Sequence, residues 1–410
     1  MYFAVSNSLN AKLKTKKSKL VSLLLDWFSK SARDLPWRRT RDPYAIWVSE
    51  IMLQQTQVKT VIPFWNRWLS ELPTIEAAAK ASSEKIHKLW EGLGYYTRVR
   101  NLQKAAQQIV AQQTSRRRRG DESQTENKLE TPHVVSYKFP ENFDDVLALP
   151  GIGRYTAGAI CSIAFNQPAP ILDGNVIRVL TRVFGIAENP KEKEPNKLLW
   201  QIAEELVSRA KNAKMAKGKD SSRTSRSSRE TNSCSFLNQS LMELGALVCT
   251  PRNPQCQICP VKKLCVAFKE NRIEELPNPG KRKPATARRF AAFAIESSGR
   301  FLVKQRPAGI VNAHLWEFPN FEINGDNSAV KDVFKSQFGF APKSISPLCT
   351  VKHSITRYRI TLEAFAVSLK KPSVKTGDVW KTPRQMRRLA FTAAHKKLAS
   401  FAANRILSGR

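Results

Sequence analysis

The sequence has no apolar run that approaches the roughly 18 residues a membrane span requires. Residues 1–20 are basic and contain no continuous apolar core, so no secretory signal is predicted and we expect a cytoplasmic protein. Acidic residues are scarce, since 34 Asp and Glu stand against 68 Lys and Arg, a formal net charge of +34. This excess predicts a polyanionic partner, nucleic acid before an anionic membrane surface.

Cysteine is also rare, with seven in 410 residues, and it is unevenly distributed. Four cysteines lie close together with the spacing C-x6-C-x2-C-x5-C, at Cys249, Cys256, Cys259 and Cys265. Without a secretory signal, clustered thiols predict metal ligands and not disulfides. The compact cage could hold a tetrahedral zinc or a [4Fe–4S] cluster. Zinc ribbons usually have two close pairs, and only one pair here has that spacing.

Hydrophobic periodicity and composition divide the chain into parts. Residues 20–110 carry apolar positions at helical spacing, which predicts successive amphipathic helices. Two polar, basic segments, 113–133 and 211–233, predict disordered surface insertions, either solvated loops or flexible arms on phosphates. A linker rich in Pro and charge is predicted at 271–288. Beyond it, three segments have the residue pattern of strands, at 289–295, 301–305 and 358–367.

The fold class is therefore expected to be mostly α, with a helical half of about 270 residues before a smaller α+β domain. The boundaries that we expect are a helical domain at 1–270, the linker, and a second domain at 289–410.

A glycine-containing turn lies in the sequence LPGIGRYTAGAI at residues 149–160. An apolar helix end at Leu149 meets a tight turn with Gly151 and Gly153, and a helix of small residues follows from Tyr155. Glycine permits positive φ and a close backbone approach, and the helix after it offers free N–H groups at its N-terminus. The pattern predicts either a helix-hairpin-helix that grips a sugar–phosphate backbone or a plain turn between helices, and the net charge favours the first.

Two carboxylates have unusual surroundings in the sequence. Asp173 stands between apolar residues and just before Gly174 and Asn175, a position that predicts the cap of a helix beginning near Asn175. It is also a candidate carboxylate at the mouth of a DNA groove, facing an electron-poor sugar. Glu50 is surrounded by apolar residues, and desolvation there would raise its pKa and keep it available as a proton donor. Its alternative is an exposed helix position.

The cysteine spacing, the hairpin and Asp173 beyond it together resemble the endonuclease III, or helix-hairpin-helix, superfamily. Within that superfamily the chain resembles the MutY adenine DNA glycosylases, in Leu35–Arg38, in the run Ser49–Val58 and in Gly92–Tyr96. The resemblance covers nearly the whole chain apart from the two polar insertions. It implies a six-helix lobe at about 40–175 and a cluster lobe made of the N-terminus and about 176–270.

The resemblance implies a monofunctional hydrolase of base excision repair. It would act as a monomer on duplex DNA that contains adenine mispaired with 8-oxoguanine or guanine, without a membrane partner, and would be nucleoid-associated in a bacterium. Adenine would be flipped out of the duplex, protonated at its N7 edge by Glu50, and released as Asp173 stabilises the sugar cation. Tyr155 and Asn175 would support these two acids. Bifunctional relatives carry a nucleophilic Lys where Tyr155 stands, so no lyase reaction is expected.

The resemblance also implies a [4Fe–4S] cofactor, held by the four cysteines, and a set of DNA contacts. Gln55 and Tyr95 would fill or wedge the base stack near the lesion. The residues that we expect at DNA are Arg38, Gln55, Tyr95, Leu149, Gly151, Gly153, Thr356 and Arg357.

The C-terminal domain resembles the Nudix-like domain of the same family. A working Nudix hydrolase needs a Glu-rich metal motif on a helix, and the matching stretch 329–340 lacks it, so we expect a domain that reads DNA. The loop that touches 8-oxoguanine in the family corresponds to Ile355-Thr356-Arg357, after His353 and Ser354. Thr356 could supply a hydroxyl, whereas Arg357 departs from the family pattern and puts a strict 8-oxoguanine preference in question.

Two other functions stay open at this point. One is an endonuclease III-like glycosylase for other damaged or mismatched bases, against which Glu50 and Tyr155 argue. The other is a non-catalytic iron–sulfur protein that binds DNA, against which the pair of Glu50 and Asp173 argues.

Overall fold

A computed structural model describes residues 2–118, 137–212, 232–280, 284–323, 329–342, 344–355, 357–369 and 378–407. Most of both predicted insertions, 113–133 and 211–233, lies outside these ranges. The chain divides into two compact units, Met1–Ala79 with Lys104–Lys281, and Lys80–Gln103 with Arg282–Arg410. Among the described helices, none has the length and apolar character that crossing a membrane demands.

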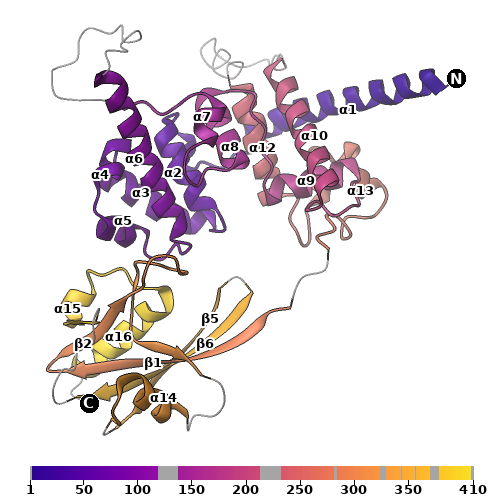
Figure 1. Ribbon diagram of the computed structural model, residues 1–410. Coiled ribbons are helices and arrows are strands. Elements are labelled where there is room, and N and C mark those ends of the chain that lie inside the picture. The colour runs from indigo at the N-terminus through magenta and orange to yellow at the C-terminus, as the bar shows by residue number, and fades with distance from the viewer. Residues whose placement is uncertain are drawn as a thin grey trace. The chain divides into compact units, whose positions relative to one another are not determined.

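The first unit is helical throughout its described residues (Figure 1). Its long N-terminal helix α1 lies against α12, and α8, α9 and α10 complete the layer around them. The α-helices are α1 (Tyr2–Ser31), α2 (Pro43–Leu53), α3 (Val58–Glu71), α4 (Ile75–Lys80), α6 (Thr97–Arg118), α7 (Phe143–Leu147), α8 (Arg154–Phe165), α9 (Gly174–Phe184), α10 (Lys193–Lys211), α12 (Ser233–Leu247) and α13 (Val266–Lys269). Three short 3-10 helices are η1 (Pro36–Arg38), η2 (Cys256–Ile258) and η3 (Lys262–Leu264).

One apolar core joins the helices of this unit that come from distant parts of the chain. Leu24 of α1, Val179 of α9 and Leu244 of α12 are among its buried members, with no or almost no exposed surface. Burial of this kind is the main favourable term in folding, about 25 cal/mol for each Å² of apolar surface removed from water. The core therefore fixes the positions of the helix ends at which the polar residues of the site lie.

The second unit is built on a seven-stranded mixed sheet in the order β3-β2-β1-β6-β5, with β4 on β1 and β7 on β2. Only β1 and β6 run parallel, and the other named pairs are antiparallel. The strands are β1 (Thr286–Ser297), β2 (Arg300–Gln305), β3 (Trp316–Glu317), β4 (Asn320–Glu322), β5 (Ser346–Ile355), β6 (Tyr358–Ser368) and β7 (Asp378–Lys381). Its helices are α5 (Ser83–Trp90), the start of α6, α14 (Ala329–Phe338), α15 (Pro383–Met386) and α16 (Ala393–Leu407).

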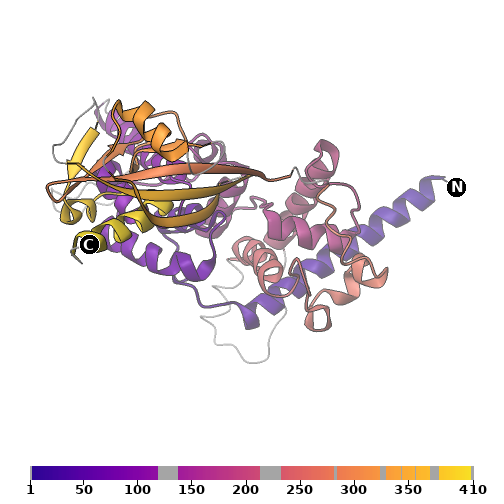
Figure 2. The same cartoon turned by 90° about the horizontal axis from the view of Figure 1, so that it is seen from below.

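The side chains of β1 alternate between the two faces of this sheet, and each face has an apolar core of its own. Ala291 and Phe293 pack with Phe334 of α14, while Ala292 and Leu398 of α16 belong to the opposite core. Figure 2 shows α14 and α16 on opposite faces. A strand that is buried on both faces loses the apolar–polar alternation, which is why the middle of β1 reads as a continuous apolar run.

Sequence and structure agree on the fold class, a helical glycosylase-type half followed by an α+β domain. Two boundaries differ in detail. Helix α6 continues to Arg118, into the stretch for which composition predicted an insertion. Strand β1 begins at Thr286, within the predicted linker, because its first residues already pair with β6. The segment Lys80–Gln103 packs within the second unit, where buried Glu91 accepts hydrogen bonds from Lys396 and from the backbone N–H of Phe391.

Candidate active site

Glu50 lies on α2 and is buried, with 5% of its surface exposed. The exposed-position alternative for this residue is therefore wrong. Its pKa is raised from 4.5 to about 7. Burial is the main cause, the nearby charge of Asp173 adds to it, and a hydrogen bond from Tyr155 and the charge of Arg38 act in the opposite direction. A carboxyl group with a pKa near neutrality holds a proton that it can transfer, which is the property of a general acid.

Tyr155 connects this acid to the hairpin. Its hydroxyl donates to Oε2 of Glu50 at 2.9 Å and lies 3.2 Å from the sulfur of Met242. Tyr155 stands in the first turn of α8, and α2 packs against α8. Burial and the neighbouring carboxylates raise its pKa well above the usual value, so the phenol stays protonated and keeps its donor.

Asp173 is the N-cap of α9, as its position before Gly174 and Asn175 predicted. Its Oδ1 accepts from the backbone N–H of Val176 at 2.7 Å, and its Oδ2 accepts from the side-chain amide of Asn175 at 3.1 Å. Burial raises its pKa above 3.8, and these hydrogen bonds partly oppose the shift. The cap holds the carboxylate in one orientation, and its charge raises the pKa values of both Glu50 and Tyr155.

The turn before α8 has the geometry of a hairpin between α7 and α8. Gly151 adopts a positive φ of 78°, and the backbone N–H of Ile152 donates to the carbonyl of Leu149 at 3.1 Å. Gly153 caps α8 without a side chain, and a Cβ built there would meet nothing within 4 Å. The N-terminus of α8 is therefore open, as binding to a phosphate requires.

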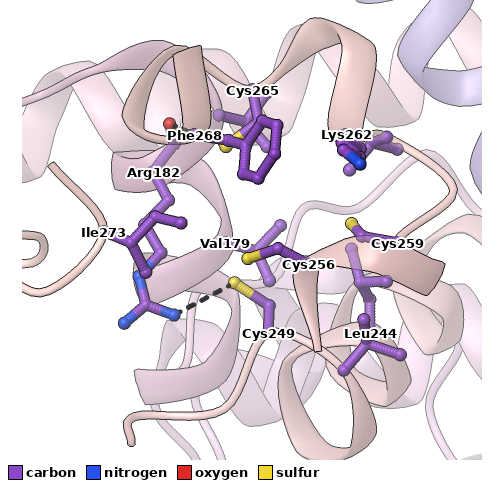
Figure 3. A pocket seen from close by; sticks show the side chains of 13 residues that line it. Val179, Arg182, Leu244, Cys249, Cys256, Cys259, Lys262, Cys265, Phe268 and Ile273 are labelled. Atoms are coloured by element: carbon purple, nitrogen blue, oxygen red, sulfur yellow. Dashed lines mark hydrogen bonds between the residues drawn. The ribbon is translucent and has the colours of Figure 1, made fainter. Parts of the chain in front are cut away.

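The four clustered cysteines line one cavity (Figure 3). The cavity is closed by apolar side chains, among them Val179, Val261 and Phe268. Arg182 reaches into it and donates to the sulfur of Cys249 at 3.4 Å. Four thiols around one enclosed space, with a cationic donor to one of them, fit a metal–sulfur centre whose thiolate charge needs compensation.

The other predicted DNA residues fall into both units. Arg38 in η1 and Gln55, which follows α2 with a positive φ of 56°, belong to the first unit. Tyr95 belongs to the second, where it has a φ of 49°, is 49% exposed, and has the guanidinium of Arg98 5.6 Å from its ring centroid. Arg357 is exposed at the turn between β5 and β6, and Thr356 lies outside the described residues.

Three regions of the chain match known families. Residues 48–205 match the HhH-GPD superfamily base excision DNA repair proteins, residues 249–265 the iron-sulfur binding domain of endonuclease III, and residues 291–400 the NUDIX domain. The adenine DNA glycosylase of Rattus norvegicus is 33% identical over 92% of this chain and 76% of its own length. That of Buchnera aphidicola subsp. Schizaphis graminum is 35% identical over 73% and 74%. A solved thermostable thymine-DNA glycosylase, 27% identical, covers 62% of this chain and 98% of its own with a TM-score of 0.48.

The chain belongs to the adenine DNA glycosylase family. It is a base-excision-repair enzyme that hydrolyses the N-glycosidic bond of adenine in DNA, and DNA is its partner. The cofactor of this glycosylase is a [4Fe–4S] cluster, which confirms the second of the two alternatives that the cysteine spacing left open.

Two polar residues near this site, Arg178 and Glu243, were not predicted from the sequence. Arg178 of α9 donates to the side-chain oxygen of Asn175 at 2.8 Å and to the backbone carbonyl of Cys249 at 2.7 Å. It therefore joins the Asp173 side of the site to the cysteine loop. The spacing of Arg178 after Asp173, one turn along the same helix, could have indicated a position near the cap.

The second missed group is Glu243 of α12, which is 1% exposed. Arg33 donates to both of its carboxylate oxygens at 2.8 and 2.6 Å, and Arg38 does so at 3.1 and 3.0 Å. Burial alone would raise the pKa of Glu243, but the two guanidinium groups lower it to about 2. No local sequence pattern could have paired residues so far apart. Glu243 is also close to the site in the chain, because its neighbour Met242 accepts from the hydroxyl of Tyr155.

Proposed function

We propose that this glycosylase removes adenine that is mispaired with 8-oxoguanine or guanine, as a monofunctional enzyme and a monomer. The observation that carries the proposal is the raised pKa of Glu50, about 7, in a buried site shared with Tyr155 and Asp173. An adenine flipped out of the duplex into this site would meet a proton donor on one side and a carboxylate on the other.

Glu50 is the general acid in this mechanism. It protonates the N7 edge of the flipped adenine, which makes the base a better leaving group. Tyr155 donates to Oε2 of Glu50, and in this mechanism Oε1 carries the proton that is transferred. Because Tyr155 is a phenol and not an amine, it cannot form a Schiff base with the sugar, and the product is an abasic site in an intact strand.

Asp173 stabilises the positive charge that develops on the sugar as the base leaves. A fixed carboxylate acts on this charge without reorganising, because its two oxygens are already held by Val176 and Asn175. The same orientation allows it to receive a proton from the attacking water as the reaction completes.

The cluster ligands in this proposal are Cys249, Cys256, Cys259 and Cys265. When bound, the cluster would join these four thiolates and so link the loop after α12, beside Val179 and Arg182 of α9. Replacing Cys256 with Ser should lower the iron and acid-labile sulfide content of the purified protein, whereas the same change at Cys349 should not. Stoichiometric zinc without iron would contradict the assignment.

The C-terminal unit reads the base opposite adenine in this proposal. Its support is an exposed arginine, Arg357, at the tip of the β5–β6 hairpin, and the lack of a Glu-rich helix, since α14 carries one acid in its first turn, Asp332. His353, Ser354 and Thr356 are the other candidates near this tip. Tyr95 is the candidate wedge, presented by a loop that Trp90 and Arg98 hold through the carbonyl of Gly94.

The decisive experiment is a single-turnover glycosylase assay on duplexes that differ only in one pair. Adenine should be released opposite 8-oxoguanine and guanine, and not opposite thymine, and strands should break only after alkali. Asp173→Asn should still bind these duplexes but release no adenine, because its charge matters only once the sugar becomes cationic. Equal release of thymine or of oxidised pyrimidines, or strand cleavage without alkali, would favour the endonuclease III-like alternative.

A further inference from the structure

Arg154 and Trp200 form a close cation–π pair. The guanidinium carbon of Arg154 lies 4.0 Å from the centroid of the Trp200 ring. Arg154 is the first residue of α8, and Trp200 lies in the middle of α10, half-buried against the core of the first unit. The pair thus joins the hairpin to a different helix.

The stacking leaves the hydrogen-bonding capacity of the arginine unused. A guanidinium that lies over an aromatic ring uses its face, while its five N–H donors point outward in its plane. Arg154 is exposed, and within the described ranges it makes no hydrogen bond or ion pair. A phosphate is the acceptor that such a planar set of donors matches, because two N–H groups can bind two oxygens at once.

Arg154 presents these N–H donors directly beside the proposed catalytic residues. The next residue is Tyr155, which donates to Glu50, and the preceding Gly153 leaves the start of α8 uncovered. A phosphate held here would fix one point of the DNA strand next to the catalytic groups, and small displacements of a substrate are costly in rate.

We propose that Trp200 is a positioning residue that holds Arg154 ready to bind a phosphate of the DNA backbone. An unrestrained arginine side chain loses rotamer entropy when it binds, and stacking on Trp200 removes part of that loss before DNA arrives. The inference depends on DNA binding by this family and not on which mispair is preferred.

The test measures binding of full-length, cluster-loaded protein to a duplex with a tetrahydrofuran abasic-site analogue, which has no glycosidic bond to hydrolyse. Fluorescence anisotropy from 50 to 200 mM KCl gives the Kd and its salt dependence. Arg154→Ala should weaken binding roughly tenfold and reduce the slope of log Kd against log salt by about 0.9, one phosphate contact. Trp200→Ala should weaken binding about three- to tenfold, since Arg154 can still reach the phosphate but is no longer held.

Two further variants separate positioning from a structural role. Trp200→Phe keeps an aromatic face and should bind within about twofold of the unchanged protein. In an Arg154→Ala background, Trp200→Ala should cause no further loss, because the residue it positions is gone. Full additivity of the two changes, an unchanged slope in Arg154→Ala, or normal binding by a folded Trp200→Ala protein would overturn the proposal.

Discussion

Glu50 and Glu243 are two glutamates of the same helical unit that are equally buried, at 5% and 1% exposure, yet their pKa values lie far apart, near 7 and near 2. Glu243 is held by two guanidinium groups, through four hydrogen bonds. Among the described residues, the side chain of Glu50 accepts a hydrogen bond from one group, the neutral hydroxyl of Tyr155, and it shares its site with another acid, Asp173.

The difference shows that burial alone does not decide what a carboxylate does. Desolvation favours the neutral acid in both places, and only the paired cations reverse it at Glu243. A buried acid without a cation keeps its proton and is available for proton transfer, while a buried acid with two cations is charged and structural. Arg38 stands between the two environments, because it binds Glu243 directly and also lowers the pKa of Glu50.

The largest expected effect comes from removing the proton of Glu50. Glu50→Gln keeps the size of the side chain and an oxygen that can accept from Tyr155, but it cannot donate a carboxylic-acid proton. The single-turnover rate of adenine release should therefore fall by about 10²- to 10⁴-fold, while DNA binding persists. In the unchanged enzyme the rate should fall as pH rises through about 7, because the raised pKa means that the active, protonated form is present only below it. A near-normal rate in the variant, or a rate that rises above pH 7, would assign the proton to another group.

A stability change is expected at the other glutamate. Glu243→Gln removes the charge that pairs Arg33 and Arg38, and a pKa lowered from 4.5 to about 2 corresponds to about 3 kcal/mol of unfolding free energy at pH 7. Since the folded pKa is depressed, this stability is present above about pH 4.5 and is lost as pH falls toward 2. Denaturant unfolding at pH 7 and pH 4 should show the gap between variant and unchanged protein narrowing at the lower pH.

Glu243→Gln should also change the pKa of Glu50, because Arg38 contacts Glu243 and acts on Glu50 through its charge. Without Glu243, the charge of Arg38 is uncompensated and should lower the pKa of Glu50 further, which moves the fall in rate to a lower pH. Arg39→Ala is the matched control, because Arg39 pairs with exposed Asp34 and leaves Glu243 untouched. If Glu243→Gln and the unchanged protein are equally stable at pH 7, the buried ion pairs make no net contribution to the free energy of unfolding. The cost of desolvating the charges would then equal the attraction between them.

The sequence could predict the parts of this site that depend on local pattern. Asp173 stands before Gly and Asn at a helix start, and the structure has it as the cap of α9. Gly151 sits in a tight turn and takes a positive φ. The spacing of the cysteines predicted a metal centre, and the four do line one cavity. Each of these depends on neighbours within a few positions, so a single stretch of sequence contains the information.

The parts that the sequence could not predict depend on contacts between distant segments. Glu243 meets Arg33 from 210 residues away, and Tyr155 meets Glu50 from 105. Periodicity indicates that a helix has a buried face, but not which charged residue of another helix will lie against it. For the same reason the assignment of Lys80–Gln103 to the sheet-containing unit had no sequence signal.

The smallest expected effect concerns the proposed reading of the base opposite adenine by Arg357, which forms no ion pair with a carboxylate in the described part of the chain. Arg357 carries its guanidinium 5.2 Å from the ring centroid of Tyr358 and donates to that hydroxyl at 3.2 Å. Discrimination needs a contact to an acceptor that guanine lacks, and the eight-position oxygen of 8-oxoguanine is such an acceptor. A good contact to a base edge contributes about 1–3 kcal/mol of discrimination, so Arg357→Ala should reduce the preference for adenine opposite 8-oxoguanine over guanine by at most ten- to a hundredfold.

Arg359→Ala is the matched control for this change, because Arg359 is exposed two residues further along β6 and carries the same charge. Both variants should weaken DNA binding as salt-dependent phosphate contacts do, but only Arg357→Ala should alter the ratio of single-turnover rates on the two mispairs. If the ratio is unchanged in Arg357→Ala, the discrimination must come from elsewhere, and Tyr95 becomes the residue to replace next. Within the described residues Arg357 forms no ion pair, which leaves its donors available to a base edge, just as Glu50, which accepts no hydrogen bond from a cation there, keeps a proton that it can transfer.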